Sequence, residues 1–87
     1  MAEIFFRTRA VKGFKSAPKD DQKRIKLTIE VLKTGKFPVH TKKLEGINEG
    51  YRIRIGRWRI LFVFEDNEID IVDIFIKKGK EDYRRKV

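Results

Sequence analysis

The sequence predicts a small α+β domain in which an N-terminal strand and two helices pack on a mainly antiparallel sheet. One observation is an apolar stripe with helical spacing within residues 18–34. Another is a pair of β-prone runs, at 51–55 and 58–64, separated by two residues that suit a tight turn. A further run at 69–76 begins just after a second turn pattern. Together these features predict a single domain that spans residues 1–87.

The N-terminal segment is expected to form a strand followed by a short helix. Residues 3–8 are aromatic and β-prone, which is typical of a strand. The hydroxyl of Thr8 suits the N-cap of a following helix. Gly13 lies inside that helix and weakens it. The helix is therefore predicted to be short and to end before Pro18.

A longer amphipathic helix is predicted over residues 18–34. Pro18 suits its first turn, and Asp20 and Asp21 stand where the positive end of the helix dipole favours acidic groups. Gly35 suits the position just after the last helical residue. The stripe that this helix is expected to bury consists of Ile25, Ile29 and Leu32.

The second half of the chain is predicted to form most of the sheet. Residues 36–41 contain a proline and predict a loop, and residues 42–46 predict a short strand. The turn at Asp66-Asn67 precedes the strand predicted over 69–76. The tail, residues 77–87, is strongly basic and is compatible with a short helix.

The composition predicts a soluble, cytoplasmic protein with an anionic partner. The chain has 87 residues and a formal net charge of +9, which favours nucleic acid, a membrane surface or an acidic protein. Ten aromatic residues (seven Phe, two Tyr and one Trp) argue against disorder. The sequence has no cysteine and a single histidine, which excludes disulfides, Cys-based zinc sites, thiol nucleophiles and histidine pairs. No apolar run approaches the roughly 18 residues of a membrane span, and Met1–Ile4 lacks a signal-peptide pattern.

An arginine-rich hairpin is the most informative segment. Side chains alternate between the two faces of a strand. If Gly56 and Arg57 form a two-residue type II′ turn, the register of the hairpin is fixed. Arg54 then lies directly opposite Arg59, and Arg52 lies on the same face. The apolar pairs predicted on the other face are Tyr51 with Phe62, Ile53 with Ile60 and Ile55 with Trp58.

Two arginines directly opposite each other suggest a binding role. Two such charges about 5 Å apart repel by about 0.8 kcal/mol in water. Guanidinium is favoured where a phosphate is held through two hydrogen bonds. The alternative is a solvated sheet face whose charge is neutralised by Asp70, Asp73 or Glu45.

The segment Lys42-Lys43-Leu44-Glu45-Gly46, followed by residues 51–62, resembles the RelE/ParE toxin superfamily. The usual pattern of that superfamily is K-L-x-G and then Y-R-[IV]-R-x-G-x-[YW]-R-[IVL]. The resemblance implies a toxin of a type II toxin–antitoxin system, neutralised by a cognate antitoxin in a hetero-oligomer. For the RelE branch it further implies cleavage of mRNA in the ribosomal A site, without metal or other cofactor. In that reaction the ribose 2′-hydroxyl attacks the adjacent phosphate.

The same resemblance implies roles for individual residues. Arg59 matches the arginine that stabilises the transition state, and Arg52 and Arg54 match positions that contact RNA or act near the 2′-hydroxyl. Tyr83 matches a tyrosine that positions or transfers a proton. The general base stays open between Tyr83, Tyr51 and a lysine, because arginine is a poor base. Lysines replace the arginine that usually precedes the tyrosine, and the predicted RNA-binding residues are Lys77, Lys78, Lys80, Lys43 and Lys26.

Other polar and aromatic candidates are interpreted as structural or incidental. A lone histidine such as His40 is more often incidental than catalytic. Trp58 and most phenylalanines are expected in the core. Strict alternation places Asp70 and Asp73 on opposite faces of their strand, which argues against a shared metal ion. The basic tail lacks the apolar interleaving of a membrane-surface helix, so no membrane partner is expected.

Two other functions stay open at this stage. One is the ParE branch of the same fold, which inhibits DNA gyrase and does not cut RNA. The other is a non-catalytic nucleic-acid-binding domain, for which the net charge alone would be sufficient.

Overall fold

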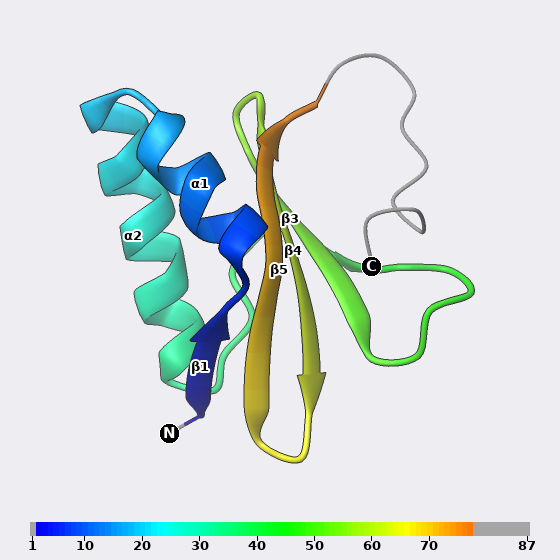
Figure 1. The fold of residues 1–87 in the computed structure, drawn as a ribbon. Coiled ribbons are helices and arrows are strands. Elements are labelled where there is room, and N and C mark those ends of the chain that lie inside the picture. Colours follow the sequence, from blue (N-terminus) through cyan, green and yellow to red (C-terminus); the bar gives the residue numbers. More distant parts are fainter. Residues whose placement is uncertain (1, 78–87) are drawn as a thin grey trace.

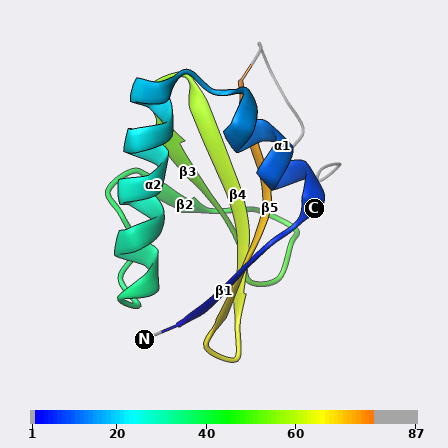
Figure 2. The same cartoon turned by 60° about the vertical axis from the view of Figure 1, so that its left-hand side comes forward.

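The computed structural model describes residues 2–77 and has a five-stranded sheet with two helices on one of its faces (Figures 1 and 2). This arrangement confirms the predicted α+β class. In chain order the elements are β1 (Glu3–Phe6), α1 (Thr8–Ser16), α2 (Lys19–Lys33), β2 (Thr41–Lys43), β3 (Gly50–Ile55), β4 (Trp58–Glu65) and β5 (Glu68–Ile76). The predicted basic tail lies outside the described residues, apart from Lys77.

The strands are arranged in the order β1-β5-β4-β3-β2. Only the β1–β5 pair is parallel, so the sheet is mainly antiparallel, as predicted. The backbone N–H of Arg7 still donates to the Ile71 carbonyl, at 3.0 Å, and the chain then enters α1 directly at Thr8. Thr8 is therefore the first helical residue. The prediction that it caps the helix is wrong, because Arg7 holds the cap position without a side-chain hydrogen bond.

Helix α2 closely matches its predicted bounds. Pro18 stands at its N-cap, Asp20 and Asp21 lie in its first turn, and Gly35 follows its end with a φ of +87°. That φ is easily adopted by glycine. No helix within residues 2–77 is long and apolar enough to cross a membrane.

The main core lies between the two helices and the sheet. Helix α1 approaches β5 so closely that a Cβ added to Gly13 would stand 1.8 Å from the Ile74 carbonyl oxygen. Gly13 is thus required for packing, although it weakens the helix. The buried residues of this core include the predicted stripe Ile25, Ile29 and Leu32, and also Ala10, Ile53, Trp58, Ile60, Phe62, Ile69, Ile71 and Ile74.

Trp58 joins the hairpin to α2. Its side chain is buried, as predicted, and its indole Nε1–H donates to Asp21 Oδ2 at 2.9 Å. Arg24 on the same helix lies against the hairpin turn, because a Cβ added to Gly56 would stand 2.7 Å from its Nη2. The position of the hairpin relative to α2 is therefore set by a hydrogen bond and by close packing.

The phenylalanines are less buried than expected. Phe62 is fully buried, but Phe5, Phe6 and Phe37 are each between 40% and 50% exposed. Phe5 and Phe6 lie on β1, an edge strand with a single neighbour. An edge strand leaves part of its apolar surface uncovered, so the expectation that most phenylalanines are core residues holds only in part.

A β-bulge in β5 corrects the prediction for the two aspartates. Asp73 pairs with Leu61 and Asp70 pairs with Val63, two residues that share one face of β4. The register shifts between Leu61 and Phe62, so β5 has one extra residue between these pairs. Asp70 and Asp73 therefore lie on the same face, not on opposite faces. Within residues 2–77, no group of three or more His, Cys, Asp or Glu side chains is placed to hold a metal ion.

Candidate nucleic-acid interface

The β3–β4 hairpin has the predicted register. Arg54 pairs with Arg59, and the three predicted apolar pairs are present. Gly56 has a φ of +57°, whereas Arg57 has no positive φ, as expected for a type II′ turn. A glycine at the first turn position and matched apolar residues on one face together force two arginines to lie directly opposite each other.

These arginines lie on the face of the sheet that the helices leave open. The alternate residues Ile53 and Ile60 are buried in the core beneath the helices, so Arg54 and Arg59 project to the other side. A smaller apolar cluster lies on that side, formed by Leu44, Leu61 and Val72 with flanking Ile47, Val63 and Phe75. These apolar side chains pack beside the charged ones.

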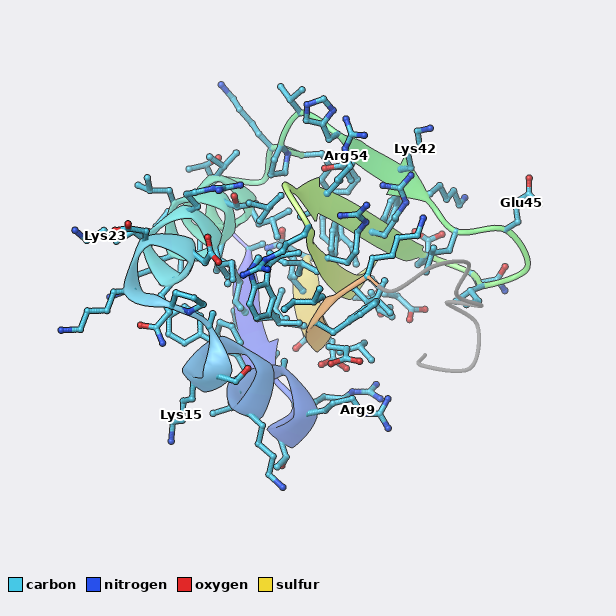
Figure 3. All side chains as sticks on the ribbon, turned by 90° about the horizontal axis from the view of Figure 1, so that it is seen from above. Arg9, Lys15, Lys23, Lys42, Glu45 and Arg54 are labelled. Atoms are coloured by element: carbon cyan, nitrogen blue, oxygen red, sulfur yellow. The ribbon has the colours of Figure 1, made fainter. Side chains whose placement is uncertain are left out.

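Strand β2 adds a lysine to this face. Lys42 pairs with Arg52, so the two side chains share the open face, whereas Lys43 pairs with Tyr51 on the helical face. In Figure 3, Lys42 and Arg54 project from neighbouring strands, far from Lys15 and Lys23 on the helices. The sequence interpretation chose Lys43 instead of Lys42, because one residue of register separates the two faces. We call Lys42, Arg52, Arg54 and Arg59 the basic face.

The guanidinium of Arg59 is held in place by the backbone of the hairpin. Its Nη1 donates to the carbonyl oxygens of Gly56 at 2.8 Å and Trp58 at 2.9 Å. Its Nε is buried and has no hydrogen-bond partner within residues 2–77. A buried donor without an acceptor costs about 1–3 kcal/mol. The guanidinium is thus fixed on one side by backbone carbonyls and lacks an acceptor at Nε.

Arg54 is exposed and contacts the histidine of the chain. Its Nη2 lies 3.3 Å from His40 Nδ1, and its backbone N–H donates to the His40 carbonyl, also at 3.3 Å. His40 was interpreted as incidental from its sequence context alone. The contact crosses from the loop before β2 to β3, and no local pattern in the sequence indicates it.

Two of the three carboxylates proposed as neutralising partners, Asp70 and Glu45, do not form ion pairs with the basic face, whereas Asp73 is buried on the open face, paired with Leu61. Asp70 pairs with Arg7 at 2.8 Å. Glu45 is exposed and points away from the sheet in Figure 3. Within residues 2–77, Arg52, Arg54 and Arg59 take part in no ion pair with a carboxylate.

The other predicted site residues are spread over the molecule. Lys77 is exposed, and its N–H donates to the Arg57 carbonyl at 3.0 Å, which places it at the hairpin end of the sheet. Lys26 borders a groove of about 400 Å³ between α1 and α2, on the helical side. Tyr51 stacks on Phe62 with ring centroids 5.3 Å apart, beneath the helices. The structure therefore brings Lys77 near the arginines and separates Lys26 and Tyr51 from them, and Tyr83, Lys78 and Lys80 lie outside the described residues.

The chain is similar to known toxins in its fold and over most of its sequence. A similar solved structure is the RelB-RelE antitoxin-toxin complex from Methanococcus jannaschii, with a TM-score of 0.74 and 29% identity over 83% of this chain and 88% of that one. The toxin RelE3 of Methanocaldococcus jannaschii is 31% identical over 85 residues, covering 93% of this chain and 97% of the relative. A protein named RelE1 from the same archaeon is 37% identical over 76 residues, or 82% of this chain and 84% of the relative.

These likenesses define the family. The chain belongs to the RelE family of toxins. No family model matches the sequence, so the assignment depends on whole-chain similarity to these relatives and on the shared fold.

Proposed function

We propose that this protein is the toxin of a type II toxin–antitoxin system and that it cleaves mRNA on the ribosome. The ribose 2′-hydroxyl attacks the adjacent phosphate, and the reaction uses no metal ion. The observation that supports this most directly is the pairing of Arg54 with Arg59 beside Lys42 and Arg52. The family assignment supports it independently.

The chemistry explains why arginines suit this position. Attack by the 2′-oxygen concentrates negative charge on the non-bridging phosphate oxygens, and fixed cations there lower the barrier. Arg59 is already held by two carbonyls, so little reorganisation is needed when charge develops.

The proposed partners are a cognate antitoxin, the ribosome and its mRNA, all in the cytoplasm. The relative from Methanococcus jannaschii was solved as an antitoxin–toxin complex. We expect the antitoxin of this chain to cover the basic face with an amphipathic helix and acidic side chains, because that face is cationic. Lys77 at the hairpin end, and Lys78, Lys80 and Tyr83 in the tail, remain the proposed further RNA contacts.

Substitution of Arg59 tests this function. We expect Arg59→Ala to reduce the rate of mRNA cleavage on programmed ribosomes by about 10²–10³-fold, which is typical when one such donor is lost. The rate is measured under single-turnover conditions by mapping the 5′ ends of the products. Far-UV circular dichroism and thermal unfolding establish that the variant is folded.

Lys23→Ala is the matched control, because it removes one positive charge from an exposed residue on the helical side. We expect it to cleave at the wild-type rate. A folded Arg59→Ala protein that cleaves as fast as the wild type contradicts the proposed role of the basic face. Intact mRNA together with inhibition of DNA supercoiling by the wild-type protein would instead assign a gyrase-directed function.

A further inference from the structure

The loop before β2 holds His40 in a defined position beside the basic face. Both the backbone N–H and the Oγ1 of Thr41 donate to the Pro38 carbonyl, at 3.3 and 2.6 Å. His40, at the corner of this turn, has a φ of +70°, a conformation that is uncommon for residues other than glycine. Its carbonyl oxygen accepts a hydrogen bond from the backbone N–H of Arg54. The turn and the edge of β3 thus fix the backbone from which the imidazole extends.

The contact between His40 and Arg54 also defines which ring nitrogen lacks a proton. A guanidinium has only donors, so in the 3.3 Å contact Nδ1 accepts and Arg54 Nη2 donates. An imidazole whose Nδ1 accepts carries its hydrogen on Nε2. A nitrogen lone pair is therefore directed at one of the cations of the basic face.

The proposed reaction needs such a group. A guanidinium has donors and no acceptor, so the arginines of the basic face cannot take the 2′-hydroxyl proton. Tyr51, one of the candidates from the sequence, is packed against Phe62 and Phe37 on the other side of the sheet. Among residues 2–77, the imidazole of His40 contacts the basic face and presents a nitrogen lone pair there, as a general base requires.

We propose that His40 is the general base of the cleavage reaction; this rests on the proposed nuclease function. When Arg54 turns its donors to the scissile phosphate, Nδ1 loses its hydrogen bond and becomes free to accept the 2′-hydroxyl proton. The O2′–P bond forms and the P–O5′ bond breaks, which leaves a 2′,3′-cyclic phosphate. The 5′-oxygen takes up a proton through solvent as the imidazolium releases the one it received. No electron, metal or water molecule is consumed.

The test uses the full-length toxin on ribosomes programmed with mRNA. His40→Gly is the best variant, because glycine adopts a φ of +70° without strain and leaves space for an added imidazole. We expect its single-turnover rate to fall by about 10²–10⁴-fold, the usual contribution of a general base. The affinity for the ribosome is expected to change less than threefold, roughly. Addition of free imidazole is expected to raise the single-turnover rate of this variant at least tenfold.

Val39→Ala is the matched control, since Val39 is the exposed neighbour in the same loop, and its rate should equal that of the wild type. A second variant, His40→Gln, keeps an acceptor for Arg54 but cannot carry the proton, so it too should be slow and should not respond to imidazole. Cleavage by either His40 variant at the wild-type rate overturns the proposal. A slow His40→Gly protein that imidazole does not rescue also overturns it and assigns a structural role.

The same experiments distinguish failure of the proposed nuclease function from failure of the proposed role of His40. If the wild-type protein itself leaves ribosome-bound mRNA intact, the nuclease function is wrong, and the role of His40 in it is wrong as well. If the wild type cleaves and Arg59→Ala does not, while His40→Gly cleaves normally, then the basic face is retained as the site and only the assignment of His40 fails.

Discussion

The two faces of the sheet are built from the same strands but serve different ends. On the covered face, alternate residues of β3 and β4 such as Ile53 and Ile60 pack beneath two helices. On the open face, the residues between them are Arg52, Arg54 and Arg59, beside a small cluster that includes Leu61. Packing that stabilises the fold is concentrated on one face and positive charge on the other. Because neighbouring residues of a strand lie on opposite faces, substitutions at adjacent positions affect different properties.

The difference also explains how like charges are kept together. Arginines directly opposite one another destabilise a strand pair. The apolar pairs on the covered face, together with the hydrogen bond from Trp58 to Asp21, fix the register in spite of this repulsion. The covered face thus holds the open face in a geometry that the arginines alone would oppose.

The sharpest test of the comparison uses two adjacent residues of β4. Ile60 and Leu61 are both fully buried, but on opposite faces. We expect Ile60→Ala to lower the free energy of unfolding by about 4 kcal/mol, and Leu61→Ala to lower it by about 2 kcal/mol. The cluster around Leu61 is smaller than the main core, so fewer packing contacts are lost there. Urea denaturation followed by Trp58 fluorescence measures both values.

Equal losses for the two variants would show that the open face contributes to stability as much as the covered one. The activity of the same proteins provides a second comparison. Leu61 lies beside the arginines, so Leu61→Ala is expected to slow cleavage more per kcal/mol of lost stability than Ile60→Ala does.

A second prediction concerns the close contact of α1 with the sheet. Gly13→Ala places a Cβ within 1.8 Å of the Ile74 carbonyl oxygen, so the helix must move away from β5. We expect a loss of about 3 kcal/mol in the free energy of unfolding, at the upper end of overpacking effects. Thermal unfolding measures it as a lowered Tm.

Gly35→Ala is the control for this substitution. Gly35 has a φ of +87°, but among the described residues no atom other than those of its chain neighbours lies within 4 Å of the added Cβ, so the backbone conformation is what resists the change. We expect a loss of about 1 kcal/mol for this variant. If Gly13→Ala costs no more than Gly35→Ala, the close approach of α1 to β5 is wrong.

The sequence predicted the hairpin fully because the information there is local. A turn glycine and three matched apolar pairs determine the register without reference to the remainder of the chain. The long helix was predicted for the same reason, since its stripe and its end signals lie within one segment. Where these local patterns agree with the tertiary packing, sequence reasoning is sufficient.

The errors arose where distant segments decide the outcome. The bulge in β5 places Asp70 and Asp73 on one face, and nothing in the local alternation marks the extra residue. The pairing of β2 with β3 selects Lys42 over Lys43. His40 gains significance only through a contact with Arg54, fourteen residues away. Each of these features depends on strand pairing or loop placement, which a single sequence does not encode locally.

The smallest expected effect concerns the ion pair that lies on the open face but outside the basic face. Arg7 and Asp70 are 2.8 Å apart, with side chains 54% and 32% exposed. We expect Asp70→Asn to change the free energy of unfolding by no more than about 0.5 kcal/mol at low salt, because solvent screens exposed pairs. In about 1 M salt the difference should vanish.

The same variant also tests whether the basic face is independent of nearby carboxylates. Because Asp70 is engaged by Arg7, its loss should leave the affinity for RNA and the cleavage rate at wild-type values. A severalfold gain in RNA affinity would instead mean that Asp70 attenuates the field of the arginines across the sheet. An unchanged cleavage rate, next to the large loss of rate expected for Arg59→Ala, would show that cleavage depends on direct contact with a few guanidinium groups and not on the summed charge of the face.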